Sequence, residues 1–469
     1  MMMSQIAAAL ADSQNAELHG NDVLMTGVSK DTRDIQQGDL YIAIKGDRFD
    51  GHAFVEDASM AGAAGALVSE MQALDMPQVK VADTRLALGQ LASYWCRQWR
   101  KDKPKAKLIG ITGSNGKTSV KEMCRKVLTD HAGESAVLST KGNLNNDIGM
   151  PLMLLELTSR HEYAVIEMGA NHVGEIDYLS SLARPDVAIV NNVGPAHLEG
   201  FGSLDNIAKG KAEIYDGLAD DGVAIINRDD VYYPFWNDYC ADKYMLTFSM
   251  TDGRADVFAK QLTEDVYLVI AEGEQAELKL EVPGKHNVMN ALAAITATSA
   301  ATRDEGLSLT SIVNSLSQFE NINGRLTALE SDRGFKVYDD SYNANPLSVS
   351  AAIDVLAGMK PRETGNTVLV LGDMAELGDE AEAMHHEMGV KAKQAGIDRL
   401  YTTGVLSVSA VDAFGDNGFY FEDKDELIAA LDESLADGDV VLVKGSRSAA
   451  MEKVVERILT QEKNNKRVN

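Results

Sequence analysis

Short apolar runs alternate with helix-like amphipathic stretches along most of the chain. The runs "LIGIT", "YAVIE", "VAIVN" and "VAIIN" each lead into a polar turn, and helix-like segments lie between several of them. Strands that are apolar throughout are typical of parallel sheets with helices on both faces. The pattern therefore predicts an α/β fold, in which ligands bind beyond the carboxyl ends of the strands.

Changes in this pattern divide the chain into three predicted domains. Residues 1–105 place the short strands "DLYIAIKG" and "AGALVSE" around a helix-like segment and predict a mixed α/β N-terminal domain. Residues 106–326 predict a central parallel-sheet domain, and residues 327–469 predict a smaller, Rossmann-like C-terminal domain. The basic stretch "RKDKPKAK", residues 100–107, contains Pro104 and predicts the first linker.

Composition and charge narrow the functions that fit. The chain of 469 residues is long enough for two or three domains, and its formal net charge of −27 without a long Lys/Arg run argues against a nucleic-acid partner. The three cysteines form no CxxC pair, which argues against a disulfide framework or a structural zinc site. The first apolar run lacks a basic region and is interrupted at Asp12, so we expect no signal peptide and no membrane span. A cytoplasmic monomer is the expected form.

A glycine-rich turn follows the first strand of the central domain. In "TGSNGKTS", Gly113 and Gly116 let backbone N–H groups converge on an anion, and the following helix adds its positive dipole end. Lys117 supplies a charge for the β- and γ-phosphates, and the Thr118 hydroxyl can bind Mg²⁺. The loop is a variant of the common pattern, because Ile111 stands at its first position. It predicts nucleotide binding and leaves a kinase, a GTPase, an ATPase and a ligase open.

Polar side chains also follow two further strands of the central domain. Glu167 ends the run "YAVIE", where it can either hold a Mg²⁺ ion together with Thr118 or face water. His197 follows "VAIVNNVGPA", and its position is compatible with a metal-binding or a structural role. Lys209 and Lys211 lie two apart on a predicted helix and do not share a face, and a solvent-facing position is the simplest interpretation for both.

Further candidates surround the junction with the last domain. His286 and Asn290 are four residues apart at the start of a predicted helix and can point into one pocket. Arg325, in "NGRL", can either reach phosphates from a neighbouring domain or form a surface ion pair. Asp340 ends the strand "FKVYDD". Arg325 and Asp340 are expected to reach a nucleotide in the central domain only if the C-terminal domain closes over it.

These motifs occur together and in a fixed order. "TGSNGKTS", "EMGANHVGEI", "NNVGPAHLEGFGS", "KAEIY", "PGKHNVMNALAA", "NGRL" and "DDSYNANP" together resemble the ATP-dependent Mur ligases of peptidoglycan synthesis. "GNLNNDIGMP", "DSYNANP", "LGDMAELG" and "LVKGSRSAAME" make the chain most similar to the members that add D-alanyl-D-alanine to a UDP-N-acetylmuramoyl-tripeptide. The resemblance spans all three predicted domains.

The resemblance implies a reaction and roles for its site residues. ATP would phosphorylate the terminal carboxylate of the tripeptide, and the amino group of D-alanyl-D-alanine would attack the acyl phosphate. Thr118 and Glu167 would hold one Mg²⁺ and His197 a second, to which a carbamylated Lys211 would also bind. The implied catalytic residues are Lys117, Lys211, His197 and Arg325. Nucleotide contacts are implied for Gly113, Ser114, Asn115, Gly116, Lys117, Thr118, Ser119, His286, Asn290, Arg325 and Asp340.

The same resemblance assigns the other two substrates. The N-terminal domain would hold the UDP-sugar and the C-terminal domain the incoming dipeptide, and meso-diaminopimelate is the expected third residue of the peptide. Substrate contacts are implied for Ser29, Lys45, Asp50 and Gly51 at the uridine part, for Thr140, Asn143 and Asn146 at the muramoyl part, and for Asn343 and Asn345 at the dipeptide.

Three other functions remain as alternatives at this point. A folylpolyglutamate synthase is a related amide ligase, but "DSYNANP" and the long N-terminal domain argue against it. A P-loop kinase or regulatory NTPase would release a nucleoside diphosphate without any amine substrate. A nucleotide-sensing scaffold would bind without turnover.

Overall fold

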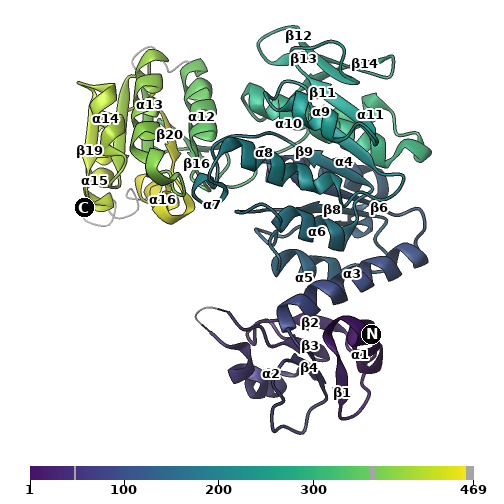
Figure 1. Ribbon diagram of the computed structural model, residues 1–469. Coiled ribbons are helices and arrows are strands. Elements are labelled where there is room, and N and C mark those ends of the chain that lie inside the picture. Colours follow the sequence, from purple (N-terminus) through teal and green to yellow (C-terminus); the bar gives the residue numbers. More distant parts are fainter. Residues whose placement is uncertain (47–48, 360–364, 461–469) are drawn as a thin grey trace.

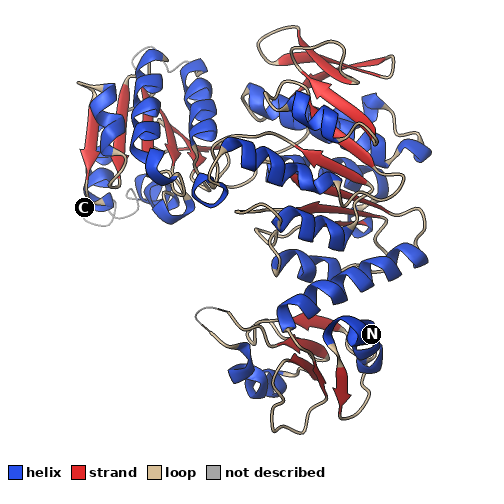
Figure 2. Ribbon diagram, viewed as in Figure 1, coloured by secondary structure: helices blue, strands red, loops and turns tan. Residues whose placement is uncertain are grey.

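The computed structural model describes residues 1–46, 49–359 and 365–460, and these form three sheets flanked by helices (Figures 1 and 2). The sheets have five, nine and six strands and follow one another along the chain. The α/β fold class with three domains, expected from the sequence, is confirmed. Within the described ranges, no helix has the length and apolar character needed to cross a membrane.

The N-terminal sheet is small and mostly parallel. Its strand order is β1-β5-β4-β3-β2, and only the β1–β5 pair is antiparallel. Apolar residues of the central strands are fully buried on both faces, as expected for strands covered by helices. The elements are α1 (Met3–Gln14), β1 (Glu17–His19), β2 (Gly27–Ser29), β3 (Asp39–Ile42), η1 (Gly51–Phe54), α2 (Val55–Ala61), β4 (Gly65–Val68), β5 (Gln78–Lys80) and α3 (Thr84–Asp102).

The central sheet carries the glycine-rich turn. Its order is β14-β13-β12-β11-β10-β9-β6-β8-β7, with parallel neighbours from β12 to β7 and an antiparallel β12-β13-β14 extension. The strands are β6 (Lys107–Thr112), β7 (Val137–Ser139), β8 (Tyr163–Glu167), β9 (Val187–Val190), β10 (Val223–Asn227), β11 (Tyr244–Ser249), β12 (Val257–Gln261), β13 (Val266–Ala271) and β14 (Glu274–Lys279). The helices are α4 (Lys117–Ala132), η2 (Glu134–Ala136), α5 (Gly149–Leu155), α6 (Glu175–Ala183), α7 (Leu198–Phe201), α8 (Leu204–Ala212), η3 (Glu213–Tyr215), α9 (Tyr233–Tyr239), α10 (Lys285–Ala301), η4 (Arg303–Glu305) and α11 (Leu309–Ser317).

Alternating side chains of the central strands build two cores. Ile109 and Ile111 of β6 pack in one cluster with α4, α10 and α11, whereas Leu108 packs in another with α5, α6 and α8. Both faces are therefore covered, and polar groups gather at the carboxyl edge of the sheet.

The C-terminal sheet has the order β15-β16-β20-β17-β18-β19 and is parallel except for β15–β16. Figure 1 shows this domain beside the central one, on the side of α7 and away from the N-terminal sheet. Its elements are β15 (Thr327–Glu330), β16 (Lys336–Asp340), α12 (Pro346–Gly358), β17 (Thr367–Gly372), η5 (Gly378–Glu380), α13 (Ala381–Gln394), β18 (Arg399–Thr403), α14 (Val408–Phe414), β19 (Gly418–Phe421), α15 (Lys424–Ser434), β20 (Val440–Lys444), η6 (Arg447–Ala449) and α16 (Glu452–Thr460).

Helix α3 joins the first two domains by packing in both. Leu88 and Leu91 lie in the N-terminal core, whereas Cys96 and Trp99 lie in the central core. The linker expected at 100–107 is therefore shorter than its composition indicated, because α3 continues to Asp102. Basic residues are favourable in the last turn of a helix, and Arg100 also forms a 2.8 Å ion pair with Asp186 of the central domain.

Candidate active site

A cleft of about 1890 Å³ runs along the carboxyl edge of the central sheet and takes side chains from all three domains. Ligand sites usually measure roughly 300–1,000 Å³, so this cleft has room for more than one small substrate. The expected site residues that line it are Ser114, Asn115, Gly116, Lys117, Thr118, Ser119, Asn143, Asn146, Glu167, His197, His286, Asn290, Arg325, Asp340, Asn343 and Asn345. The expected residues that are not among its lining are Gly113, Thr140, Lys211, Ser29, Lys45, Asp50 and Gly51.

The glycine-rich turn between β6 and α4 has the shape of a phosphate cradle. Gly116 has φ +77° and precedes the first residue of α4, so the backbone N–H groups of the first helical turn point out at this end. A Cβ at Gly116 would also overlap the amide groups of Asn191 and Asn290. Glycine is therefore needed here for both its backbone conformation and its small volume.

An asparagine network supports the turn from behind. The Asn191 Nδ2 group donates to Asn115 O at 3.0 Å and to Asn290 Oδ1 at 2.9 Å. Asn191 directly follows β9, so the strand-end rule could have singled it out, but the sequence analysis did not name it. The Asn115 Nδ2 and Asn191 Oδ1 atoms are buried and find no hydrogen-bond partner among the described residues. Buried polar atoms without partners are costly, so these two fit a site that receives a polar ligand.

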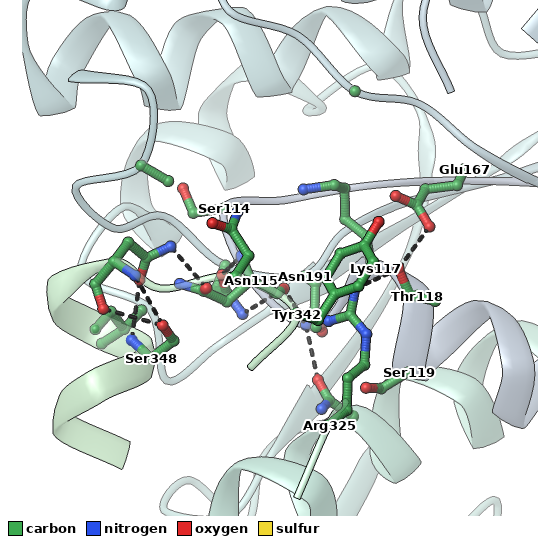
Figure 3. Close-up of a pocket in the computed structure, with 18 of the residues that line it drawn as sticks. Ser114, Asn115, Lys117, Thr118, Ser119, Glu167, Asn191, Arg325, Tyr342 and Ser348 are labelled. Carbon is green, nitrogen blue, oxygen red and sulfur yellow. Dashed lines mark hydrogen bonds between the residues drawn. The ribbon is translucent and has the colours of Figure 1, made fainter. Parts of the chain in front are cut away.

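Thr118 lies at the centre of the charged part of the cleft (Figure 3). Its hydroxyl donates to Glu167 Oε2 at 2.9 Å and accepts from the Arg325 guanidinium at 3.0 Å. Asn145 Nδ2 holds the other oxygen of Glu167 at 2.7 Å. Sequence reasoning missed Asn145, although it lies in the quoted "GNLNNDIGMP".

A hydroxyl and a carboxylate at hydrogen-bond distance form a donor set that suits Mg²⁺. Magnesium prefers oxygen ligands and is commonly held by one or two carboxylates, water and substrate phosphates. In the described part of the chain, no three His, Cys, Asp or Glu side chains gather into a metal cluster. Thr118 and Glu167 therefore fit a Mg²⁺ ion that is bound mainly together with a nucleotide.

Lys117 is held inside the turn that precedes it. Its Nζ atom donates to Gly113 O at 2.8 Å. Burial lowers the pKa of Lys117, nearby Arg325 lowers it further, and the Glu167 carboxylate opposes both effects. An anion placed beside Lys117 and Arg325 would relieve their mutual repulsion.

Lys211 is the most deeply buried of the candidate cations. Only 1% of it is exposed, and its Nζ atom lies 3.5 Å from Ala170 O and 5.3 Å from the centre of the Phe201 ring. Burial, together with the charge of Lys117, lowers the pKa of Lys211 to about 7. Lys209, on the other face of α8, is exposed. The expectation that these two lysines face different ways is confirmed, but the solvent-facing interpretation of Lys211 is wrong.

His197 faces the C-terminal domain across the cleft. Its Nδ1 atom forms a short hydrogen bond with the Glu376 carboxylate. Burial and the charge of Lys117 lower the pKa of His197, and Glu376 opposes them. Sequence reasoning quoted "LGDMAELG" but gave Glu376 no role.

Arg325, at the boundary between the central and C-terminal domains, and Asn345, of the C-terminal domain, both contact residues of the "TGSNGKTS" motif. Arg325 reaches Thr118 while its guanidinium stacks 4.3 Å from the centre of the Tyr342 ring (Figure 3). Asn345 caps α12 through its Oδ1 atom, and its Nδ2 atom donates to Asn115 Oδ1 at 2.8 Å. Arg325 therefore contacts Thr118 in this arrangement of domains, and closure of the C-terminal domain over a nucleotide stays a prediction.

Asp340 and His286 lie beside this contact. The Asp340 carboxylate forms a 2.6 Å ion pair with Lys444, a buried residue of "LVKGS" that the sequence analysis had not singled out. Lys444 also donates to Asn343 O at 2.9 Å. Burial lowers the pKa of His286, although Asp340 opposes the effect. Asp340 therefore already has a cationic partner within its own domain.

Of the residues expected at the uridine part, Lys45, Asp50 and Gly51 belong to one turn of the N-terminal domain and Ser29 ends β2. Lys45 and Asp50 pair across this turn at 3.9 Å, and Asp50 accepts from the His52 backbone N–H at 3.0 Å. A Cβ at Gly51 would lie 2.7 Å from Ile44 N, so the turn needs glycine. Ser29 accepts from the Asp31 backbone N–H at 3.0 Å. Residues 47 and 48, which lie between Lys45 and Asp50 in the sequence, are outside the described ranges.

Two of the three residues expected at the muramoyl part lie at the cleft. Asn143 and Asn146 line it, and Asn146 Oδ1 accepts from the Gly149 N–H at the start of α5. Thr140 lies behind the cleft, where its hydroxyl accepts from the Glu167 N–H at 2.9 Å. Arg85 and Asp147 form an ion pair that lines the cleft where the N-terminal domain meets the central one.

Comparison with known proteins agrees with this geometry. The models of the Mur ligase family, catalytic domain, of the Mur ligase middle domain and of the Mur ligase, glutamate ligase domain match residues 24–95, 111–298 and 324–447. The UDP-N-acetylmuramoyl-tripeptide--D-alanyl-D-alanine ligase of Escherichia coli (strain K12) is 43% identical over 97% of this chain and 98% of its own. The protein of the same name from Bacillus subtilis (strain 168) is 37% identical over 92% and 93%.

Solved structures give the same result. MurF from Acinetobacter baumannii superimposes with a TM-score of 0.87 at 34% identity, over 97% of this chain and 98% of its own. MurF ligase from Thermotoga maritima in complex with ADP gives a TM-score of 0.80 at 26% identity, over 94% and 98%. The similarity extends over nearly the whole chain and all three domains, and the chain belongs to the Mur ligase family.

Proposed function

We propose that this protein is an ATP-dependent ligase that joins D-alanyl-D-alanine to a UDP-N-acetylmuramoyl-tripeptide in peptidoglycan precursor synthesis. The observation that carries the proposal is the convergence of Lys117, the Thr118–Glu167 pair and Arg325 at one edge of the central sheet. The name of the E. coli relative states this reaction for that protein.

The first step transfers a phosphoryl group to the tripeptide. A terminal carboxylate oxygen of the tripeptide attacks the γ-phosphorus of ATP, the bond to the β–γ bridging oxygen breaks, and ADP leaves. Lys117 and Arg325 offset the charge that develops on the phosphoryl oxygens. A bound Mg²⁺ would neutralise phosphate charge as well, and Thr118 and Glu167 are the residues that would hold it.

The second step forms the amide. The amino group of D-alanyl-D-alanine attacks the acyl carbon and loses a proton, and inorganic phosphate leaves with the oxygen that carried it. Asn343 and Asn345 border the cleft near α12 and would orient the dipeptide. Asn345 combines this role with a contact to the phosphate turn.

The remaining parts of the substrates would lie in the cleft and, for the uridine, on the N-terminal domain outside its lining. The domain of residues 1–105 would hold the UDP-sugar, with Ser29, Lys45, Asp50 and Gly51 at the uridine and Asn143 and Asn146 nearer the muramoyl part. Thr140 would act indirectly, by holding the backbone of Glu167. The domains of residues 106–326 and 327–469 would bind ATP and the dipeptide, with His286 and Asn290 near the nucleotide and Asp340 near its ribose.

A carbamylated Lys211 is part of the proposal. Carbon dioxide adds only to a neutral amine, and burial gives Lys211 a pKa of about 7 that makes this form available near neutral pH. The carbamate would supply oxygen ligands to a second Mg²⁺ together with His197.

The proposal also includes the location of the enzyme, its oligomeric form and the third residue of its peptide substrate. The enzyme would work in the cytoplasm, where ATP and UDP-linked precursors are found, and we take a monomer as its form. A structure of the A. baumannii relative is named for a 2,6-diaminopimelate-containing substrate and is 33% identical, which supports meso-diaminopimelate as the third residue here.

Phosphate release provides the decisive test. We expect release from ATP only when UDP-N-acetylmuramoyl-tripeptide and D-alanyl-D-alanine are both present, together with a new UDP-linked pentapeptide detected by mass spectrometry. Equal phosphate release without either substrate would identify an NTPase instead.

A further inference from the structure

Two residues with left-handed backbone conformations meet across the boundary between the central and C-terminal domains. His197 has φ +57° and Glu376 has φ +62°, and neither is a glycine. Such conformations are costly for residues with side chains and persist where the surrounding structure imposes them, often at functional sites. Both residues line the cleft, and their side chains are hydrogen-bonded to one another.

The loop that carries Glu376 is anchored on both sides. Asp373 accepts from the Ser407 backbone N–H at 2.9 Å, and Met374 N–H donates to the buried His385 Nε2 at 2.9 Å. Met374 and Leu377 are themselves buried. The C-terminal core therefore presents Glu376 to the central domain in one position.

Glu376 also meets the helix that follows His197. Its backbone carbonyl accepts from the Glu199 N–H, in the first turn of α7, at 3.2 Å. The same residue thus holds the histidine side chain and the chain segment immediately after it. A surface ion pair alone contributes little to stability, so the contact is better explained by the geometry that it imposes on His197.

We infer that Glu376 is a positioning residue which fixes the tautomer and orientation of His197 for metal binding. The carboxylate accepts the proton of Nδ1, so a neutral His197 presents an unprotonated Nε2. Histidines that bind metals typically donate their second N–H to a carboxylate or carbonyl, and loss of that partner weakens metal binding roughly 10–100-fold. The C-terminal domain would thereby complete a metal site of the central domain only when the two domains are in contact. The inference rests on the metal-binding role proposed for His197.

The first test reads the tautomer directly. ¹⁵N spectra of the histidine-labelled protein, with the His197→Gln variant to assign the signal, should show His197 protonated at Nδ1. Glu376→Ala should remove this preference. Glu376→Gln should largely retain it, because an amide oxygen also accepts from Nδ1. Asp379→Ala changes an exposed acidic residue of the adjoining helix η5 and should leave the signal unchanged.

The second test measures metal affinity without turnover. Mn²⁺ titrated by electron paramagnetic resonance in the presence of a non-hydrolysable ATP analogue should bind about 10-fold or more weakly to Glu376→Ala. Glu376→Gln should recover most of the affinity, and Asp379→Ala should match the parent. Thermal melting should confirm that all variants fold.

The outcomes separate this inference from the proposed ligase function. An unchanged tautomer and unchanged Mn²⁺ affinity in Glu376→Ala would overturn the inference even if the parent makes the pentapeptide. A variant that loses affinity with no change of tautomer would overturn it as well. If Glu376→Ala shifts the tautomer and weakens Mn²⁺ binding while the parent protein makes no pentapeptide, the inference would stand and the ligase function would fail.

Discussion

The phosphate turn and helix α8 each supply a lysine to the proposed reaction, but they are built in different ways. Around Lys117, consecutive residues of one turn create the cradle, and the glycines can be identified from the sequence alone. Lys211 lies on an ordinary helical surface by composition. Its environment comes from Phe201 of the preceding helix and from Ala170 and Lys117, which are distant along the chain. The comparison shows that a local sequence motif is enough to build an anion-binding turn. A lowered lysine pKa, in contrast, requires burial by the tertiary structure.

The largest effect is expected at the phosphate turn. Lys117→Ala should lower kcat by about 10²–10³-fold, because charge on a transferring phosphoryl group is stabilised mainly by fixed cations. Single-turnover phosphate release would measure the chemical step, and circular dichroism should show an intact fold. Near-normal turnover in this variant would place the γ-phosphate elsewhere.

Removal of the lysine in α8 should cause a large loss of activity that an added carboxylate partly reverses. Lys211→Ala should lose most activity, roughly 10²-fold, and a short-chain carboxylate such as acetate should restore part of it by replacing the lost oxygen ligand. Lys209→Ala is the matched control, because this lysine is exposed on the same helix. If Lys209 proved to be the sensitive residue, or if acetate had no effect, the carbamate assignment would fail.

The burial of Lys211 also predicts how stability depends on pH. In buffer free of carbon dioxide, its folded-state pKa of about 7 lies below the ordinary 10.5, so the unfolded chain binds more protons between these values. Stability contributed by this residue should therefore rise with pH through that window, by at most about 1.4 kcal/mol per pH unit. Urea unfolding of the parent against Lys211→Met, which cannot titrate, should show this difference. Parallel pH profiles would contradict a depressed pKa.

The smallest effect concerns the support that the turn receives from the C-terminal domain. Asn345→Asp keeps the acceptor that caps α12 but removes the amide donor to Asn115. The KM for ATP should rise several-fold, by about the 1 kcal/mol of one hydrogen bond, while the melting temperature changes little. Asn345→Ala removes the cap as well, so it should raise the KM for ATP and also lower the melting temperature. A KM unchanged in both variants would show that the turn needs no support from that domain.

Much of the fold could be predicted from the sequence because its strands are short apolar runs with side chains buried on both faces. The runs predicted near "LIGIT", "YAVIE" and "FKVYDD" correspond to β6, β8 and β16. The end of α3 was misjudged, because "RKDKPKAK" has the composition of a linker while its first residues complete a helix held by the Arg100–Asp186 pair. Composition indicates only the local preference of the chain for helix or loop. The end of this helix depends on a contact with a residue 86 positions further along the chain.

The phosphate turn, the strand-end Glu167 and the order of the family motifs were determined by the sequence alone, since each depends on neighbouring residues or on a repeated strand-and-turn pattern. Only the tertiary structure decided that Lys211 is buried, that Asn191 and Asn290 close against Gly116, and that Glu376 meets His197. These features arise between segments that are far apart in the chain, where the pKa of a lysine or the tautomer of a histidine is set by the groups packed around it.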